Sequence, residues 1–98
     1  MAKSPILVVA EVQHIHDAPA LAQYQALVRE QVRNMECRVI GRGGLSFEGT
    51  PPFSNVLIQA WSDEQMFRDW QASKEYAPLR AARQAAASMR IAIVPHLI

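Results

Sequence analysis

Two spacings of hydrophobic residues alternate along this chain and predict four strands and two helical regions. Segments rich in valine and isoleucine, which favour strands, are expected at residues 5–14, 38–42, 55–61 and 90–98. Apolar residues at steps of three and four predict helices over residues 18–35 and 62–89. The second helical region is interrupted at Ser73, and we expect it to restart at about Pro78, since proline fits only the first turn of a helix.

The first strand is expected to have two unlike faces. Alternation places four apolar residues on one face: Ile6, Val8, Ala10 and Val12. The other face begins apolar and turns polar: Leu7, Val9, Glu11 and Gln13. A single layer of helices would need to cover only the first of these faces.

The helical regions carry start signals and apolar stripes. Asp17 is expected to cap the first helix, with Pro19 in its first turn. Ser62 and Gln65 have the spacing of a capping box for the second region. The stripe of the first helix is expected to be Leu21, Tyr24, Val28, Val32 and Met35. The stripes of the second region are expected to be Met66, Phe67, Trp70, Leu79, Ala82, Ala86 and Met89.

Paired glycines, Gly43 and Gly44, follow the second strand. Such a pair could cradle a phosphate, but no helix N-terminus follows it, so we favour a bend over an anion-binding loop. A brief extended piece at residues 45–48 and a proline-containing turn at residues 49–55 lead into the third strand.

The order of elements, strand–helix–strand–strand–helix–strand, predicts the α+β ferredoxin-like βαββαβ fold. Right-handed crossovers give a four-stranded antiparallel sheet with both helical regions on one face. The other face is expected to expose Leu7, Val9, Leu57, Trp61 and alternate residues of the last strand. Because an apolar sheet face exposed to water is a binding surface, we expect a homodimer that packs sheet against sheet.

The size of the chain supports one domain, residues 1–98, with a thin core. A chain of 98 residues hides only about 60–65% of the surface that it exposes when unfolded. Its single cysteine, Cys37, cannot form an internal disulfide and is expected to be a small buried hydrophobe. Oligomerisation is then the usual way to bury more surface.

Charge and hydropathy argue against several partners. The net charge is +1, and basic residues are scattered rather than gathered into a patch for nucleic acid. No apolar run approaches the roughly 20 residues of a membrane span. The run after Lys3 is too short for a signal-peptide core. We expect a cytoplasmic protein with no nucleic-acid or membrane partner and no cofactor.

A series of short motifs resembles the bacterial domain-of-unknown-function 1330 family: GRGG, FEG, VLIQAW, SKEY and LRAAR. Their order and spacing agree over about residues 24–94. The first strand matches more loosely, since members often open with an aromatic residue where this chain has Ile6 and Leu7. The resemblance implies the dimeric α+β barrel group, a homodimer and a cleft between helices and sheet. It implies no established activity, because the wider group includes monooxygenases, isomerases and haem enzymes.

Tyr76 and Arg83 are the leading candidates for a ligand site. If their segment is helical throughout, they lie seven residues apart on nearly the same line. A guanidinium there could clamp a ligand carboxylate bidentately. The alternative, favoured on the sequence alone, is structural: Arg83 would pair with Glu48 or cap backbone carbonyls near the connection between the second and third strands.

Four further residues are candidates for ligand binding. Arg42 and Glu48 flank the glycines; Glu48 could be a general base if burial raised its pKa, but a rim position is the commoner role. Trp61, at a strand end, could line a pocket, although aromatic residues are usually core. His14 could be a base or hold a metal with His16, but no third ligand lies at suitable spacing.

Two functions of different classes follow. In the first, a dimeric domain binds or transforms a small anionic organic molecule in a cleft between helices and sheet, using Arg42, Tyr76 and Arg83. In the second, the dimer is a non-catalytic assembly, and Trp61, Phe67 and Trp70 fill the space beneath the helices. A haem or metal enzyme that uses a histidine is a third possibility.

Overall fold

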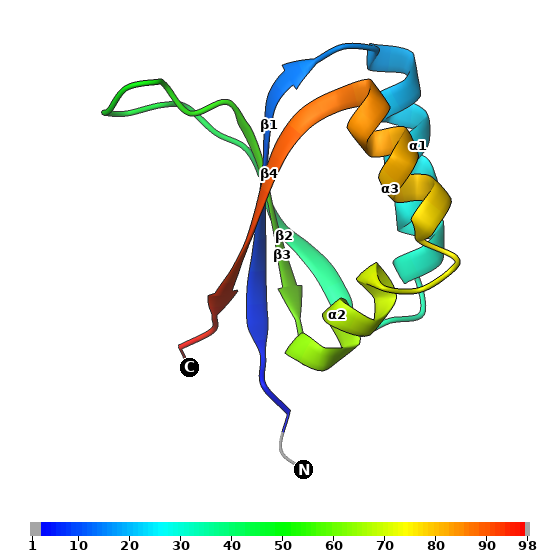
Figure 1. Cartoon of the computed structure of the whole chain (residues 1–98). Coiled ribbons are helices and arrows are strands. Elements are labelled where there is room, and N and C mark those ends of the chain that lie inside the picture. Colours follow the sequence, from blue (N-terminus) through cyan, green and yellow to red (C-terminus); the bar gives the residue numbers. More distant parts are fainter. Residues whose placement is uncertain (1–2, 98) are drawn as a thin grey trace.

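A computed structural model describes residues 3–97 and shows one antiparallel sheet with all helices on one face (Figure 1). The strands are β1 (Ile6–Ile15), β2 (Cys37–Gly43), β3 (Asn55–Trp61) and β4 (Ala87–Pro95). The helices are α1 (Ala18–Val32), α2 (Glu64–Gln71) and α3 (Ala77–Ala86). The strand order is β2-β3-β1-β4, with every neighbouring pair antiparallel. The predicted ferredoxin-like α+β fold is confirmed.

The pairing register decides which side chains face the helices. Ile6, buried beneath the helices, pairs with Trp61, so Trp61 faces the helices as well. Ala10 pairs with Leu57 and gives Leu57 the same side. The prediction that Trp61 and Leu57 lie on the opposite face was therefore wrong. Alternation fixes the two faces of each strand, but only the register between strands relates one strand's faces to another's.

The face away from the helices is called here the open face. Its apolar residues come from the three strands β1, β3 and β4: Leu7, Val9, Val56, Ile58, Ala60, Ala92 and Val94. Glu11 and Arg90 pair with each other across β1 and β4 on this same face. Arg38 of β2 pairs with Ala60 and therefore lies on this face too. The open face is thus largely apolar, with one internally neutralised pair of charges and the cation of Arg38 at its β2 edge.

The core lies between the sheet and the helices and is centred on aromatic rings. The Trp61 ring stacks on Trp70 at a centroid distance of 5.6 Å and meets Phe67 edge-on at 5.2 Å. Trp70 in turn packs against Tyr76 at 4.5 Å. Aliphatic residues such as Leu79 close the core on the α3 side.

The helix start of α1 is as predicted and that of α2 is not. An Asp17 side-chain oxygen accepts the Ala20 N–H at 3.0 Å, which confirms the cap of α1. The capping box at Ser62 was wrong, because α2 follows Asp63 and the Ser62 hydroxyl donates to Glu36 instead.

The boundary between α3 and β4 also differs from the prediction. The helix was expected to continue to Met89, but it ends at Ala86, and β4 begins at Ala87 without a loop. Ala87 pairs with Ile15 of β1, so sheet hydrogen bonding overrides the helix propensity of an alanine-rich run. Met89 therefore packs on the core from the sheet. Ala82, predicted to be buried, is exposed; residue 98 lies outside the described residues.

The connection between β2 and β3 forms an arm, residues 44–54, that projects from the sheet on the side away from the helices (Figure 1). Gly43 and Gly44 have φ angles of 93° and 112°, a left-handed conformation that glycine adopts readily, and this confirms the predicted bend. The pairing of β2 with β3 also shifts between Val39 and Gly41, where β2 bulges. None of the helices within residues 3–97 is long and apolar enough to cross a membrane.

Candidate functional site

Three polar side chains from α1, from the residue before α3 and from α3 itself meet, and we call them the donor cluster: Tyr24, Tyr76 and Arg83. The hydroxyls of Tyr24 and Tyr76 lie 2.9 Å apart, and an Nη of Arg83 donates to the Tyr76 hydroxyl at 3.0 Å. Tyr76 is fully buried and Tyr24 is 8% exposed, while Arg83 is half-buried. The sequence indicated that Tyr76 and Arg83 could meet, and the structure shows that they do.

The turn before α3 sets the position of Tyr76. The Ser73 hydroxyl donates to the Trp70 carbonyl at 2.7 Å and accepts the Tyr76 N–H at 3.2 Å, which winds the chain tightly after α2. The side chain of Gln31 in α1 accepts the Trp70 indole N–H and donates to the Glu75 carbonyl. Tyr76 immediately precedes α3, so Arg83 lies two turns along the same helix.

The donor cluster carries more hydrogen-bond donors than acceptors. Two phenols share one hydrogen bond, so one of their two O–H groups is not used between them. Burial first, and then the bond to Tyr76, raise the pKa of Tyr24 above its ordinary value; the nearby Arg83 opposes this rise. Tyr24 therefore stays a protonated donor at neutral pH.

Arg83 has no acidic partner in the part of the chain that the structure describes. The ion pairs there join Lys3 to Glu36, Arg33 to Glu30, Arg68 to Glu64, and Arg90 to Glu11. The positive charge of Arg83 is instead directed at a neutral phenol. Arg80, one turn earlier in α3, lies over the Tyr76 ring at 5.2 Å and adds positive charge to this region.

Arg42 and Glu48, the other charged candidates, are separate from the donor cluster. Arg42 is exposed near the end of β2, and Glu48 is exposed in the arm. Among residues 3–97, Arg83 forms no ion pair with Glu48, so that predicted pairing was wrong. Arg83 donates to the Tyr76 hydroxyl instead.

His14 and His16 lie side by side at the end of β1, with ring centroids 4.7 Å apart, and both are exposed. The His16 ring is within hydrogen-bond distance of the Ser88 hydroxyl, at 3.1 Å. His96 pairs its backbone with Pro5 at the opposite end of β1. Within residues 3–97, no group of three or more histidine, cysteine or acidic side chains could hold a metal ion.

Two hollows border the aromatic core. The larger, about 580 Å³, lies between the end of α1, α2 and the turn before α3, and is lined by residues that include Gln31, Met66 and Trp70. The smaller, about 410 Å³, is lined by residues that include Cys37 and Trp61. Trp70 connects the larger hollow to the donor cluster, because the same ring packs on Tyr76.

Tyr24 belongs to the donor cluster but was predicted only as part of an apolar stripe. The available signal was chemical: a tyrosine placed on a buried helix face must find a hydrogen-bond partner for its hydroxyl. The partner, Tyr76, is 52 residues away, and helical spacing cannot reveal it.

Solved structures similar to this chain share its fold at low sequence identity. A protein of unknown function from Rhodopseudomonas palustris aligns with a TM-score of 0.81 and 18% identity, over 98% of this chain and 85% of that one. A dimeric ferredoxin-like protein of unknown function from Jannaschia sp. CCS1 aligns with a TM-score of 0.72 and 7% identity, over 94% of this chain and 99% of that one. SnoaB, a cofactor-independent oxygenase from Streptomyces nogalater, aligns with a TM-score of 0.62 and 17% identity, over 97% of this chain and 95% of that one.

These identities show a shared fold and nothing about shared chemistry. No curated protein matches the chain in sequence. A family model does match, over residues 5–97, which is nearly the whole chain. The chain belongs to the family described as Domain of unknown function (DUF1330).

Proposed function

We propose that this protein is a homodimer that binds a small anionic organic molecule at the donor cluster of Tyr24, Tyr76 and Arg83. One observation carries the proposal: a half-buried guanidinium is directed at a buried pair of phenols and has no carboxylate partner within the described residues. A ligand carboxylate would accept from Arg83 and from the spare phenolic O–H together.

The surroundings of the donor cluster support an organic ligand rather than an inorganic ion. Tyr76 packs against Trp70 and belongs to the same core cluster as Leu79, and both of these neighbours in the core are buried. Apolar walls with a few convergent polar groups are typical of sites for small organic molecules. The positive charges of Arg83 and Arg80 favour a negatively charged one.

The non-catalytic alternative predicted that Trp61, Phe67 and Trp70 fill the space beneath the helices. These three residues are buried against one another, so this part of the core is solid. The packing of these three rings fills the space beneath α2. It provides no hydrogen-bond acceptor for the donor cluster, which lies between α1 and α3. A ligand-binding experiment separates the two functions.

The experiment compares carboxylates with their neutral amides. Benzoate, phenylacetate and succinate are titrated against the protein in parallel with benzamide, phenylacetamide and succinamide, and binding is followed by tryptophan fluorescence, since Trp70 contacts Tyr76. At least one carboxylate is expected to bind, and its amide should bind about 10- to 100-fold more weakly, because a hydrogen bond to a charged group contributes about 1.5–3 kcal/mol.

Arg83→Gln should reduce carboxylate affinity by a similar factor. Arg29→Gln is the matched control, because Arg29 is exposed on α1 and forms no ion pair within the described residues. Equal binding of carboxylates and amides, or equal effects of the two substitutions, would contradict the proposed site.

The homodimer is proposed from the open face, where seven apolar residues of β1, β3 and β4 have no helix over them. Two copies related by a two-fold axis can pack the same face of each chain together, and this buries both apolar faces at once. Sedimentation equilibrium at micromolar concentration should return twice the monomer mass of 11.0 kDa. A protein that stays monomeric throughout would overturn this part of the proposal.

A further inference from the structure

We propose that the arm, residues 44–54, of each copy packs against the second copy in the homodimer. This inference rests on the proposed dimer and adds a second contact to it, distinct from the open face. The arm is then part of an interface between two chains rather than a free surface loop.

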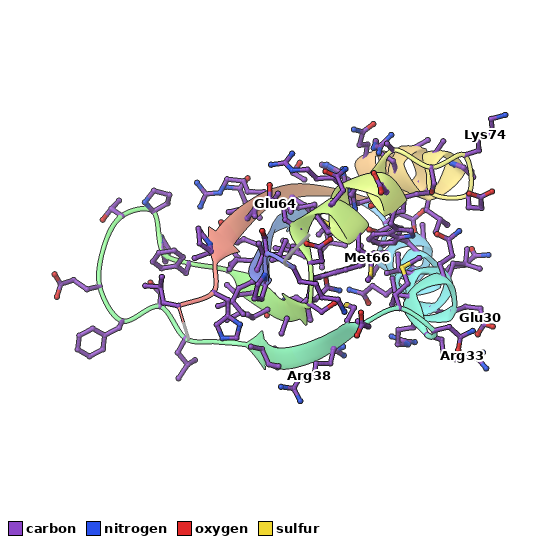
Figure 2. All side chains as sticks on the ribbon, turned by 90° about the horizontal axis from the view of Figure 1, so that it is seen from below. Glu30, Arg33, Arg38, Glu64, Met66 and Lys74 are labelled. Atoms are coloured by element: carbon purple, nitrogen blue, oxygen red, sulfur yellow. The ribbon has the colours of Figure 1, made fainter. Side chains whose placement is uncertain are left out.

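The apolar side chains of the arm have almost no cover within their own chain. Leu45 is 96% exposed, Phe47 97% and Phe53 61%. Single exposed apolar residues are common, but large ones gathered in one short segment mark an interaction surface. Figure 2 shows the side chains of this loop standing clear of the rest of the molecule.

The base of the arm is fixed to the sheet. The Glu11 carboxylate accepts the backbone N–H of Ser54 at 3.0 Å and a guanidinium N–H of Arg90 at 2.9 Å. Glu11 is 8% exposed and is the buried charged residue among those described. A buried carboxylate bound on both sides holds the direction in which the arm leaves the sheet.

That direction points to a second copy. Figure 1 shows the arm leaving the sheet on the side away from the helices, which is the side of the open face. A partner stacked on the open face would lie beside the arm, and two-fold symmetry would place its own arm beside the first sheet. The open face and the arm then lie on the same side of the sheet, with the Glu11–Arg90 pair at the base of the arm between them.

The exposed area matches what a dimer needs. The chain exposes 6864 Å², whereas a folded monomer of 11.0 kDa exposes about 5,600 Å². The excess, about 1,200 Å², exceeds the roughly 800 Å² per partner of a standard protein interface.

The arm holds one acidic residue, Glu48, and no basic residue, so it lacks the cations that attach loops to anionic membranes.

The first test measures the dimer dissociation constant of a Leu45→Ser, Phe47→Ser double variant by sedimentation equilibrium. We expect an increase of about tenfold or more, because buried aromatic residues dominate interface energies. Leu27→Ser is the control, since Leu27 is partly exposed on α1, on the helix side of the sheet. The control should dimerise as the wild type does.

The second test places an environment-sensitive fluorophore at position 47, through a Cys37→Ser, Phe47→Cys double variant. Its emission should shift to the blue as the concentration rises through the dissociation constant. A wild type that never dimerises would overturn the dimer itself. If the wild type dimerises, the Leu45→Ser, Phe47→Ser variant dimerises equally well and the emission of the labelled Phe47→Cys variant does not shift, only the role of the arm is overturned.

Discussion

A phenol buried in a protein core needs a hydrogen-bond partner, and Tyr24 and Tyr76 supply one for each other. The burial of Tyr24 could be predicted from its place on the stripe of the first helix. The pairing could not, because it depends on how α1 and the turn before α3 come together. Arg83 then adds a charge to this pair, so that the three residues form one hydrogen-bonded unit.

Tyr76→Phe should reduce the free energy of unfolding by about 1–3 kcal/mol, because it leaves the buried hydroxyl of Tyr24 without its partner. Urea denaturation measures this change. The double variant with Tyr24→Phe should lose less than the sum of the two single losses, since both substitutions break the same bond. Additive losses would show that the two hydroxyls do not depend on each other.

Burial of Cys37 raises the pKa of its thiol to about 11, so very little thiolate exists near neutral pH. The folded protein should therefore react with a disulfide reagent at pH 8 about a hundredfold more slowly than free cysteine. The same measurement in urea should give the rate of an unhindered thiol. A fast reaction in the folded state would contradict the environment found for Cys37.

Among the secondary-structure elements, the order and type were predictable, but their relative register was not. Strand periodicity identified the faces of β1, whereas the pairing of Ile6 with Trp61 decided that Trp61 belongs to the core. Likewise, the alanine-rich run before Met89 favours a helix locally, and pairing with β1 turns its end, from Ala87 onward, into a strand. Long-range pairing, which one sequence does not reveal, settled both cases.

The base of the arm predicts a specific response to acid. The Ser54 N–H and the Arg90 guanidinium lower the pKa of Glu11 below that of a free glutamate. A lowered folded-state pKa means that this stabilisation is present above the unfolded value, about 4.3, and is lost as the pH falls below it. The melting temperature of the wild type should therefore decrease as the pH is lowered from about 5, and the melting temperature of Glu11→Gln should decrease less steeply.

Glu30→Gln is the control for this titration, because Glu30 is exposed on α1 and distant from the arm along the sequence. It should preserve the acid sensitivity of the wild type. If Glu11→Gln and the wild type lose stability in parallel, the carboxylate of Glu11 does not hold the base of the arm.

At the scale of the whole molecule, the sheet with helices on one face makes a folded chain that is only 17 Å across its thinnest axis. A dimer could be proposed from the chain length and from the apolar second face of the sheet. The arm could not, since its glycines and prolines indicate a turn without showing how far that turn projects.

The proposed dimer should be held by apolar contact more than by charge. The open face contains one neutral pair, Glu11 with Arg90, and one further cation, Arg38, at its β2 edge, and the net charge of the chain is only +1. The dissociation constant should therefore change little between low and high sodium chloride, and the melting temperature should rise with protein concentration. Dissociation by salt alone would show that the interface is ionic.

The bulge in β2 also bears on how far assembly can proceed. β2 and β4 are the outer strands of the sheet, and outer strands invite edge-to-edge growth into filaments. β2 interrupts its pairing between Val39 and Gly41 and carries Arg38 and Arg42, while β4 ends in Pro95, which has no N–H to offer. Because neither edge readily adds a strand, the proposed association would use the open face of the sheet, and it would end once two chains have met.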